Sequence, residues 1–177
     1  MTIILCGFKN CGKTTLGKSL AKKTEADFID TDDLIVAAFK KDKGQELSIS
    51  EVFLALGEDD FRTLERKIIK AIKPKKNTVI ATGGGAILDD VSVKVLKGLG
   101  PLVYISVAKN ELLTRLLKKV KTPSFMDGAD PKKAFHAYYE ARKERYLSVA
   151  DEVLDLKRKS PTKWVAELKK IMEKSGA

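Results

Sequence analysis

The sequence predicts an α/β protein with a five-stranded parallel sheet and helices on both faces. Five short apolar segments, rich in β-branched residues, alternate along the 177-residue chain with segments of helical periodicity, and such alternation is typical of parallel sheets. A glycine-rich phosphate-binding motif follows the first of these segments. Because we find no internal repeat and no change of composition, we expect one domain over residues 1–177. The predicted strands are residues 2–6, 27–30, 78–82, 102–107 and 152–156.

The phosphate-binding motif is the octapeptide GFKNCGKT at residues 7–14, which matches G-x-x-x-x-G-K-[ST]. Gly7 and Gly12 allow the backbone to turn sharply, so that successive N–H groups face one concavity at the start of the next helix. Lys13 is placed to reach the β- and γ-phosphates of a nucleotide, and the Thr14 hydroxyl to ligate Mg²⁺. A chance match in a glycine-rich turn is the alternative, but a strand before the motif and an amphipathic helix after it favour a nucleotide site.

Acidic residues follow the second strand and open a helix over residues 34–39. Carboxylates at a helix start have a structural explanation, because they cap the helix and interact favourably with its dipole. Carboxylates at the carboxyl end of a strand in an open α/β sheet also face the ligand crevice. The two interpretations are equally good for Asp30 and Asp33. For Asp32 we favour a function, either in holding Mg²⁺ through water or in accepting a hydroxyl proton.

The next segment predicts two helices with an arginine between them. Residues 48–56 begin with a capping box and form a short helix, and an apolar stripe indicates a second helix over residues 66–72. Arg62 has Glu58 and Glu65 at helical spacing, so a structural ion pair is one interpretation. The other is that its guanidinium binds the carboxylate of a ligand.

Consecutive glycines follow the third strand, and they are Gly83, Gly84 and Gly85. They form either a flexible turn or a place where backbone N–H groups approach a ligand closely. A helix over residues 86–99 comes next. After the fourth strand, a helix over residues 110–119 carries Arg115.

The last third of the chain predicts a loop followed by a long helix. Residues 120–130 have loop composition, and a loop of this length in a compact domain is often a lid or a binding loop. Pro131 at the first helical position then starts a helix that runs to about residue 149 and carries Arg142. The fifth strand and a helix that starts near Pro161 complete the pattern.

The net charge of +10, from 34 Lys and Arg against 24 Asp and Glu, invites a nucleic-acid interpretation. Many of the lysines, however, lie in helix-compatible stretches, where a solvated helix face explains them. We find no zinc-ligand spacing and no aromatic RNA-binding motif in the sequence. Positive potential around a cleft also suits an enzyme that handles phosphates. We therefore expect no nucleic acid as a partner.

The sequence also bounds the compartment. No apolar run approaches the roughly 18 residues of a membrane span, and the chain enters its first strand without the pattern of a signal peptide. Cys6 and Cys11 do not form a C-x-x-C pair, and a structural disulfide is not expected. We expect a cytoplasmic monomer that does not bind membranes.

In this order, the motifs resemble the shikimate kinase family, small P-loop kinases that pass the γ-phosphate of ATP to the 3-hydroxyl of shikimate. The resemblance covers nearly the whole chain and includes the phosphate-binding motif, the Asp-Thr-Asp at 30–32, the block at 48–65, the glycines at 83–85, and Arg142 with Tyr146 after it. It implies a fold like that of the nucleoside monophosphate kinases. It also implies a substrate-binding helical segment at about residues 32–72 and a lid at about residues 119–131.

The resemblance further implies what the site binds and with which residues. ATP, Mg²⁺ and shikimate are the expected small molecules. The implied nucleotide-binding residues are Asn10, Cys11, Gly12, Lys13, Thr14, Thr15, Arg115 and Arg158. The implied substrate-binding residues are Asp32, Arg62, Gly83, Gly84, Gly85 and Arg142. Catalysis is assigned to Lys13, Asp32 and Arg115, and the metal to Thr14 and Asp32.

One departure from the family pattern lies in the lid. Where the family usually has Arg-Pro-Leu, this chain has Thr122, Pro123 and Ser124. Lys119 or Lys121 could substitute for the arginine, although a lysine lacks its planar fork. Two alternatives stay open: a related kinase for another polyol such as gluconate, and a P-loop protein that binds nucleotide with reduced turnover. A nucleoside monophosphate kinase is disfavoured, because two arginines beside a glycine-lined pocket suit a small carboxylate better.

Overall fold

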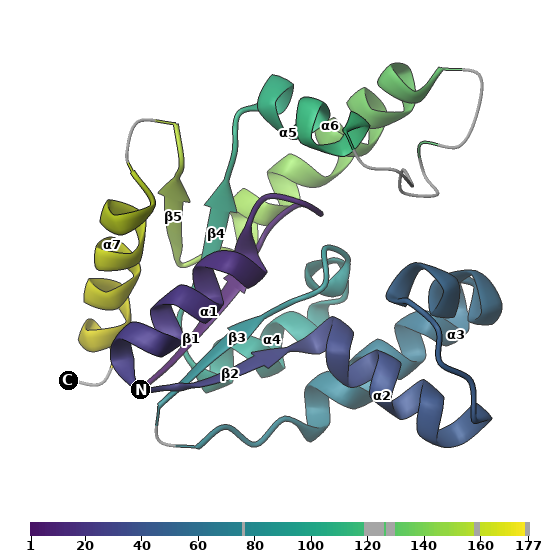
Figure 1. Ribbon diagram of the computed structural model, residues 1–177, viewed down its shortest axis with the longest axis horizontal. Coiled ribbons are helices and arrows are strands. Elements are labelled where there is room, and N and C mark those ends of the chain that lie inside the picture. The colour runs from purple at the N-terminus through teal and green to yellow at the C-terminus, as the bar shows by residue number, and fades with distance from the viewer. Residues whose placement is uncertain (76, 119–125, 127–129, 158–159, 176–177) are drawn as a thin grey trace.

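The five predicted strands form one parallel sheet in the computed structural model, which describes residues 1–75, 77–118, 126, 130–157 and 160–175. The strand order is β2-β3-β1-β4-β5, and every neighbouring pair runs parallel. Figure 1 shows helices on both faces of this sheet, so the predicted fold class is confirmed. The strands are β1 (Thr2–Cys6), β2 (Asp27–Asp30), β3 (Thr78–Ala81), β4 (Leu102–Ser106) and β5 (Glu152–Asp155).

The helices connect the strands, because parallel strands need crossover segments. Helix α1 packs on α7 and on β3, while α4 contacts β1 and α6 contacts β4. The helices are α1 (Lys13–Thr24), α2 (Thr31–Lys43), α3 (Ile49–Ala71), η1 (Ala86–Leu88), α4 (Asp90–Leu99), α5 (Lys109–Leu117), α6 (Pro131–Val149) and α7 (Pro161–Lys174).

The main core lies on both faces of the two central strands. All five residues of β1 and all four of β3 are buried, which explains why these strands are apolar without alternation. The edge strands are more exposed, and in β5 only Leu154 is buried. The order of the sheet places β1 and β3 side by side, so the segments that leave their carboxyl ends meet above the middle of the sheet.

Helices α2 and α3 pack mainly against each other and form a projecting unit beside the sheet (Figure 1). A small core of their own lies between them, formed by Ile35, Phe39, Val52 and Phe61. This unit coincides with the helical segment expected at residues 32–72. Because β2 runs directly into α2, the unit begins at the same edge of the sheet as the phosphate-binding motif.

Helix α3 differs from the two separate helices predicted for this region. Its residues run from Ile49 to Ala71, with non-helical angles at Gly57 alone (φ 73°, ψ 173°). A positive φ of this kind suits glycine, so the helix changes direction there and resumes at once. The acidic residues after Gly57 lie within the helix. Burial of the later positions Phe61 and Glu65 anchors this part of the helix.

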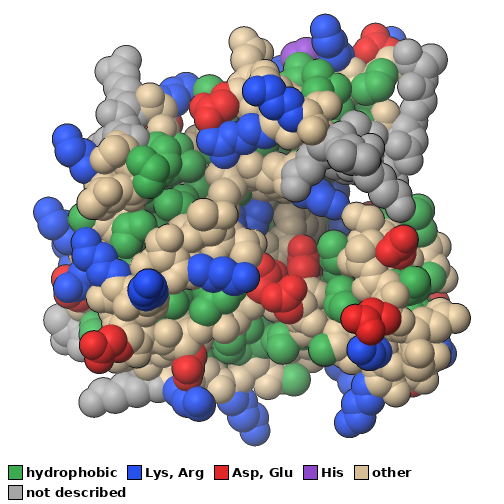
Figure 2. All heavy atoms as spheres, viewed as in Figure 1, with side chains coloured by type: hydrophobic (Ala, Val, Ile, Leu, Met, Phe, Trp, Pro, Cys, Tyr) green, Lys and Arg blue, Asp and Glu red, His purple; other side chains and the backbone are tan. Residues whose placement is uncertain are grey.

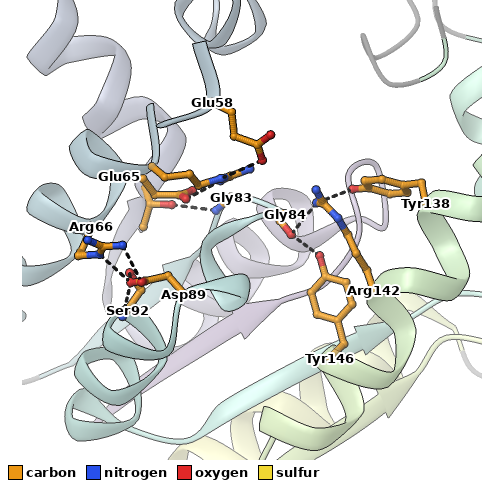
Figure 3. Close-up of polar contacts among 12 residues, drawn as sticks. Glu58, Glu65, Arg66, Gly83, Gly84, Asp89, Ser92, Tyr138, Arg142 and Tyr146 are labelled. Carbon is orange, nitrogen blue, oxygen red and sulfur yellow. Dashed lines mark hydrogen bonds and ion pairs between the residues drawn. The ribbon is translucent and has the colours of Figure 1, made fainter. Parts of the chain in front are cut away.

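The helix predicted over residues 86–99 is also divided. A short 3₁₀ turn, η1, precedes α4, and Asp89 lies between them as the N-cap of α4. The Asp89 carboxylate accepts hydrogen bonds from the Ser92 N–H and hydroxyl and from two nitrogens of Arg66, at 2.9 and 3.1 Å (Figure 3). Burial acts to raise the pKa of Asp89, but these hydrogen bonds and the Arg66 charge outweigh it and lower the pKa to about 2. The pair fastens α3 to the start of α4.

Asp89→Asn should lower the free energy of unfolding by roughly 1.5–3 kcal/mol, the range for a hydrogen bond to a charged group. Asparagine still caps a helix, so the loss reports the ion pair with Arg66. A depressed pKa stabilises the fold above the unfolded pKa of about 3.9. The difference between wild type and variant in urea unfolding should therefore be full above about pH 4 and shrink as the pH falls through about 2.

The matched control is Asp60→Asn, which removes a carboxylate from an exposed position of α3. It should change the free energy of unfolding by no more than about 0.5 kcal/mol. If Asp89→Asn behaves like this control, the ion pair contributes nothing to stability.

Two other features bear on the sequence-based expectations. None of the helices among the described residues is both long and apolar enough to cross a membrane. Cys6 and Cys11 are both buried and both free. Burial raises the pKa of the Cys6 thiol to about 12, so this side chain stays protonated and behaves as a small apolar group.

Candidate active site

A cavity of about 560 Å³ opens at the carboxyl ends of β1, β2 and β3. Its walls come from the phosphate-binding motif, the start of α2, the kinked helix α3, the glycine segment after β3, and α6. Figure 2 shows the hollow near the middle of the molecule, with acidic side chains beside it. This is where ligands bind in open α/β sheets.

The phosphate-binding motif has the conformation that its glycines predict. Gly7 and Gly12 have positive φ angles of 146° and 105°. A Cβ atom on Gly7 would lie 2.9 Å from the Ile105 carbonyl oxygen, so a side chain cannot be accommodated there. The buried Lys13 ammonium donates hydrogen bonds of 2.9 Å to the carbonyls of Gly7 and Phe8. Lys13 therefore braces the loop and holds its charge at the edge of the cavity.

Residues from three other elements contact or adjoin this motif. Arg115 on α5 donates hydrogen bonds to the carbonyls of Asn10 and Cys11, at 3.4 and 3.2 Å. The Thr14 hydroxyl donates to an Asp30 carboxylate oxygen at 2.9 Å. The other oxygen of Asp30 accepts from the Asp32 N–H at 3.0 Å and so caps α2. Both interpretations of Asp30 are thus compatible with its position, since one carboxylate caps the helix and faces the nucleotide-binding motif.

Asp32 lies in the first turn of α2 and lines the cavity. Burial and repulsion from Asp30 raise its pKa above the usual value, although the charges of Lys13 and Lys9 act in the opposite direction. A Cβ atom on Gly83 would lie 2.6 Å from an Asp32 carboxylate oxygen. Because glycine has no side chain, Gly83 leaves the space that the Asp32 carboxylate occupies.

Arg62 enters the cavity wall from α3, and its contacts are compatible with both roles that the sequence left open. Its guanidinium donates a hydrogen bond of 2.6 Å to Glu65 and lies 4.0 Å from a Glu58 oxygen. It also lines the cavity, directly over Gly85, where a Cβ atom would come within 2.3 Å of its nitrogens. Burial raises the pKa of Glu65, and Arg62 opposes this effect. The ion pair holds the arginine at the cavity.

Arg142 reaches the same cavity from α6. One of its terminal nitrogens lies 3.4 Å from the Gly84 carbonyl oxygen and 3.2 Å from the Tyr138 hydroxyl. Figure 3 shows Arg142 and Tyr146 both pointing at Gly84, whose carbonyl also accepts a hydrogen bond from the Tyr146 hydroxyl. Arg62 and Arg142 thus lie on either side of the glycine segment, which suits a ligand carboxylate bound between them.

Most of the expected site residues meet in the cavity. Those that line it are Asn10, Lys13, Thr14, Asp32, Arg62, Gly83, Gly84, Gly85 and Arg142. Cys11 is 1% exposed and Thr15 points to solvent, so their side chains do not line it. Arg115 bonds to backbone carbonyls of the loop and does not line the cavity. Arg158 and most of the expected lid, including Lys119, Lys121 and Thr122, lie outside the described residues.

Several residues that line the cavity were not predicted as site residues, among them Lys9, Glu65 and Tyr138. Lys9 spans from the phosphate-binding motif to the start of α3, where its ammonium donates to the Ser50 hydroxyl at 3.0 Å. Glu65 was named only as an ion-pair partner, and Tyr138 was not singled out. Glu65 lies three positions after Arg62, and Tyr138 four before Arg142. Helical neighbours of a candidate arginine are therefore the signal that could have found them.

The donor set fits Mg²⁺ bound together with nucleotide phosphates. Magnesium in such sites uses one or two protein oxygens, with phosphates and waters as the other ligands. The Thr14 hydroxyl and the carboxylates of Asp30 and Asp32 supply oxygens of this kind beside the phosphate-binding motif. No cluster of three or more potential metal ligands occurs in the part of the chain that the structure describes, as this mode of binding requires none.

Fold and site together define a P-loop kinase for a small, anionic acceptor, with the nucleotide motif at one end of a cavity and two arginines at the other. Comparison with known proteins identifies the family. The sequence model described as shikimate kinase matches residues 9–173. The chain therefore belongs to the shikimate kinase family, whose members are ATP-dependent phosphotransferases with a hydroxyl group as acceptor.

Individual relatives agree with this assignment. A shikimate kinase of Thermodesulfovibrio yellowstonii is 41% identical over 121 residues, which are 68% of this chain and 66% of that protein, just under two thirds. A shikimate kinase of Clostridium botulinum is 39% identical over 144 residues, which are 81% of each chain.

Solved structures extend the similarity over nearly the whole chain. The crystal structure of a shikimate kinase from Bacteroides thetaiotaomicron aligns over 98% of both chains with a TM-score of 0.80 and 28% identity. A shikimate kinase from Acinetobacter baumannii, solved in complex with shikimate, aligns over 98% of this chain and 93% of that one, with a TM-score of 0.82 and 26% identity.

Proposed function

We propose that this chain transfers the γ-phosphate of ATP to the 3-hydroxyl of shikimate. The observation that carries the proposal is the arrangement of the cavity, which has Lys13 and Thr14 at one end, Asp32 beside them, and Arg62 and Arg142 at the other. A small acid held by both guanidiniums would present its hydroxyl groups to the Asp32 carboxylate. We further propose a cytoplasmic monomer that binds neither nucleic acid nor membranes.

The donor end of the site supports in-line phosphoryl transfer. Such transfer depends on positioning and on neutralising charge in the transition state rather than on covalent chemistry. The N–H groups of the phosphate-binding motif and Lys13 would hold the β- and γ-phosphates. Bound Mg²⁺, held by Thr14 and through water by Asp32, would neutralise further charge on those phosphates.

The acceptor end supports substrate orientation. Arg62 is fixed by Glu65, and Arg142 lies against Gly84, so the two cations are in place before a ligand arrives. Preorganised charge-assisted pairs of this kind give both affinity and orientation. Asp32 would contact the ring hydroxyls and orient or deprotonate the attacking one.

The test is ADP release coupled to a spectroscopic readout, with shikimate, gluconate and other hydroxylated acids as acceptors. Turnover that depends on shikimate supports the proposal. Turnover with gluconate and not shikimate would assign the chain to another polyol. ATP binding without turnover on any acceptor would support a nucleotide-binding protein, and in both cases the proposed function would be wrong.

Arg62→Lys should raise KM for shikimate strongly while KM for ATP barely moves. Lysine keeps the charge but cannot reproduce the planar, bidentate contact with a carboxylate. Steady-state kinetics with each substrate varied in turn provide the measurement. Arg66→Lys is the matched control, because Arg66 is on the same helix but bonds to Asp89 outside the cavity. A parallel rise of both KM values in Arg62→Lys would make Arg62 a structural residue only.

A further inference from the structure

Arg62 and Arg142 are held in chemically different ways. Arg62 is bonded to a carboxylate, that of Glu65. The hydrogen-bond acceptors found for Arg142 among the described residues are the neutral Gly84 carbonyl and the Tyr138 hydroxyl. The Glu65 charge also acts on Arg142, but no carboxylate among the described residues accepts a hydrogen bond from it. Neutral partners orient the guanidinium and leave it able to pair with a ligand carboxylate.

Tyr138 makes two contacts with Arg142 from one turn earlier in α6. The guanidinium carbon lies 4.3 Å from the centroid of the tyrosine ring, which is a cation–π distance. The Tyr138 hydroxyl lies 3.2 Å from an Arg142 terminal nitrogen (Figure 3). Ring and hydroxyl together fix both the plane and the direction of the guanidinium.

The tyrosine is itself held in place by the phosphate-binding motif. Its ring lies 5.7 Å, centroid to centroid, from that of Phe8, a motif residue that is 1% exposed. Phe8 in turn stacks on Tyr139 at 4.8 Å. Tyr138 also lines the cavity, and its hydroxyl lies 3.7 Å from the place that a Cβ atom on Gly84 would take. The residue therefore connects the loop that holds the donor with the arginine that faces the acceptor.

We infer that Tyr138 is a positioning residue that aims the Arg142 guanidinium at the acceptor's carboxylate and so sets the preference for an acid over its neutral analogue. The inference rests on the proposed function. Truncation of the tyrosine would leave Arg142 charged but free to turn toward solvent. The enzyme would then lose discrimination between acid and neutral acceptors, in addition to affinity.

Two variants separate the contacts of Tyr138. Tyr138→Phe keeps the ring and removes the hydroxyl, and it should raise KM for shikimate roughly 3–10-fold, as loss of one hydrogen bond does. Tyr138→Leu removes both contacts and should raise KM roughly 10–100-fold. In both variants KM for ATP should stay unchanged and kcat should change less than KM. Tyr139→Phe, which removes the neighbouring hydroxyl outside the cavity, is the matched control.

The decisive readout compares shikimate with its uncharged amide as acceptors. We define acid selectivity as kcat/KM for shikimate divided by kcat/KM for its amide. In Tyr138→Leu this selectivity should fall by about the same factor by which KM for shikimate rises. The double variant Tyr138→Leu/Arg142→Met should have the same acid selectivity as Arg142→Met alone. The reason is that Tyr138 acts through Arg142, and the effects of contacting residues are not additive.

Three outcomes overturn the inference. If acid and amide lose kcat/KM equally in both Tyr138 variants, the tyrosine is only part of the packing. Unchanged kinetics in Tyr138→Phe and Tyr138→Leu, with folding confirmed by circular dichroism, would exclude any role. If the wild-type protein shows no turnover with shikimate, the proposed function and this inference are both overturned. The first two outcomes, observed in variants of an active wild-type enzyme, overturn the inference alone.

Discussion

Lys13→Ala should abolish phosphoryl transfer to shikimate. Lys13 is the buried cation at the donor end of the cavity, with its ammonium held by the Gly7 and Phe8 carbonyls. Removing one preorganised donor from a charged transition state typically lowers kcat by about 10²–10³-fold, and cationic groups in phosphoryl transfer can contribute more. A coupled ADP-release assay at saturating ATP and shikimate measures the loss.

The same substitution removes three hydrogen bonds inside the loop, to these two carbonyls and to the Cys11 sulfur. Activity must therefore be compared with folding and nucleotide binding. Circular dichroism and the affinity for ADP serve that purpose. Lys22→Ala, at an exposed position of the same helix, should leave kcat unchanged. Near-wild-type turnover in Lys13→Ala would contradict the assignment of residues 7–14 as the phosphate-binding site.

Asp32→Asn should lower kcat by roughly 10²–10⁴-fold, the usual contribution of general-base catalysis, and should also stabilise the fold. Asparagine has nearly the same shape as aspartate but no charge. The carboxylate lies in a buried site close to Asp30, and both effects raise its pKa. An ionised group under these conditions destabilises the native state, so its removal increases the free energy of unfolding while it removes the base.

The pH dependence of this gain follows from the direction of the shift. When an acid has a higher pKa in the folded state, the folded protein binds more protons, and stability falls as the pH rises from the unfolded pKa through the folded one. Asp32→Asn should therefore gain most over wild type near neutral pH, and the gain should vanish below the usual aspartate pKa of about 3.9. Urea unfolding at neutral and acidic pH tests this.

Asp33→Asn is the matched control for both effects. Asp33 lies in the same first turn of α2 but is exposed and does not line the cavity. Its removal should change neither kcat nor, by more than about 0.5 kcal/mol, stability. If Asp32→Asn keeps wild-type kcat, Asp32 has no catalytic role, and its carboxylate only interacts with the dipole of α2, whose N-cap is Asp30.

The strands were the most predictable part of the fold. Each is a short apolar segment bounded by polar or glycine residues. The segments that form β1 and β3 are apolar without alternation, which is typical of strands buried on both faces of a parallel sheet. The helix boundaries were less predictable. Gly57 bends a helix that the sequence analysis ended there, and Asp89 starts a helix within a segment that seemed continuous. The start of α4 involves a contact with a distant residue, because Asp89 bonds to Arg66 as well as capping the helix.

The site was predictable where a motif or a strand end marks it. Lys13 and the glycines at 83–85 belong to local patterns, and the structure places them at one cavity. Glu65 and Tyr138 carry no pattern of their own. Their importance arises because α3 and α6 bring them against Arg62 and Arg142, and only the folded chain determines which face of each helix meets the cavity.

The break at Gly57 joins two traits that an engineer would wish to change one at a time. The part of α3 after the break carries Arg62 and is fastened to the body of the protein through Arg66 and Asp89. The part before it carries Phe53, which lines the cavity and packs with the small core between α2 and α3. The guanidinium carbon of Arg62 lies 5.9 Å from the centroid of the Phe53 ring, so the two parts of the helix meet at the arginine. Substitution at Phe53 should therefore change both the range of rings accepted and the affinity for a carboxylate, because residues in contact do not act independently.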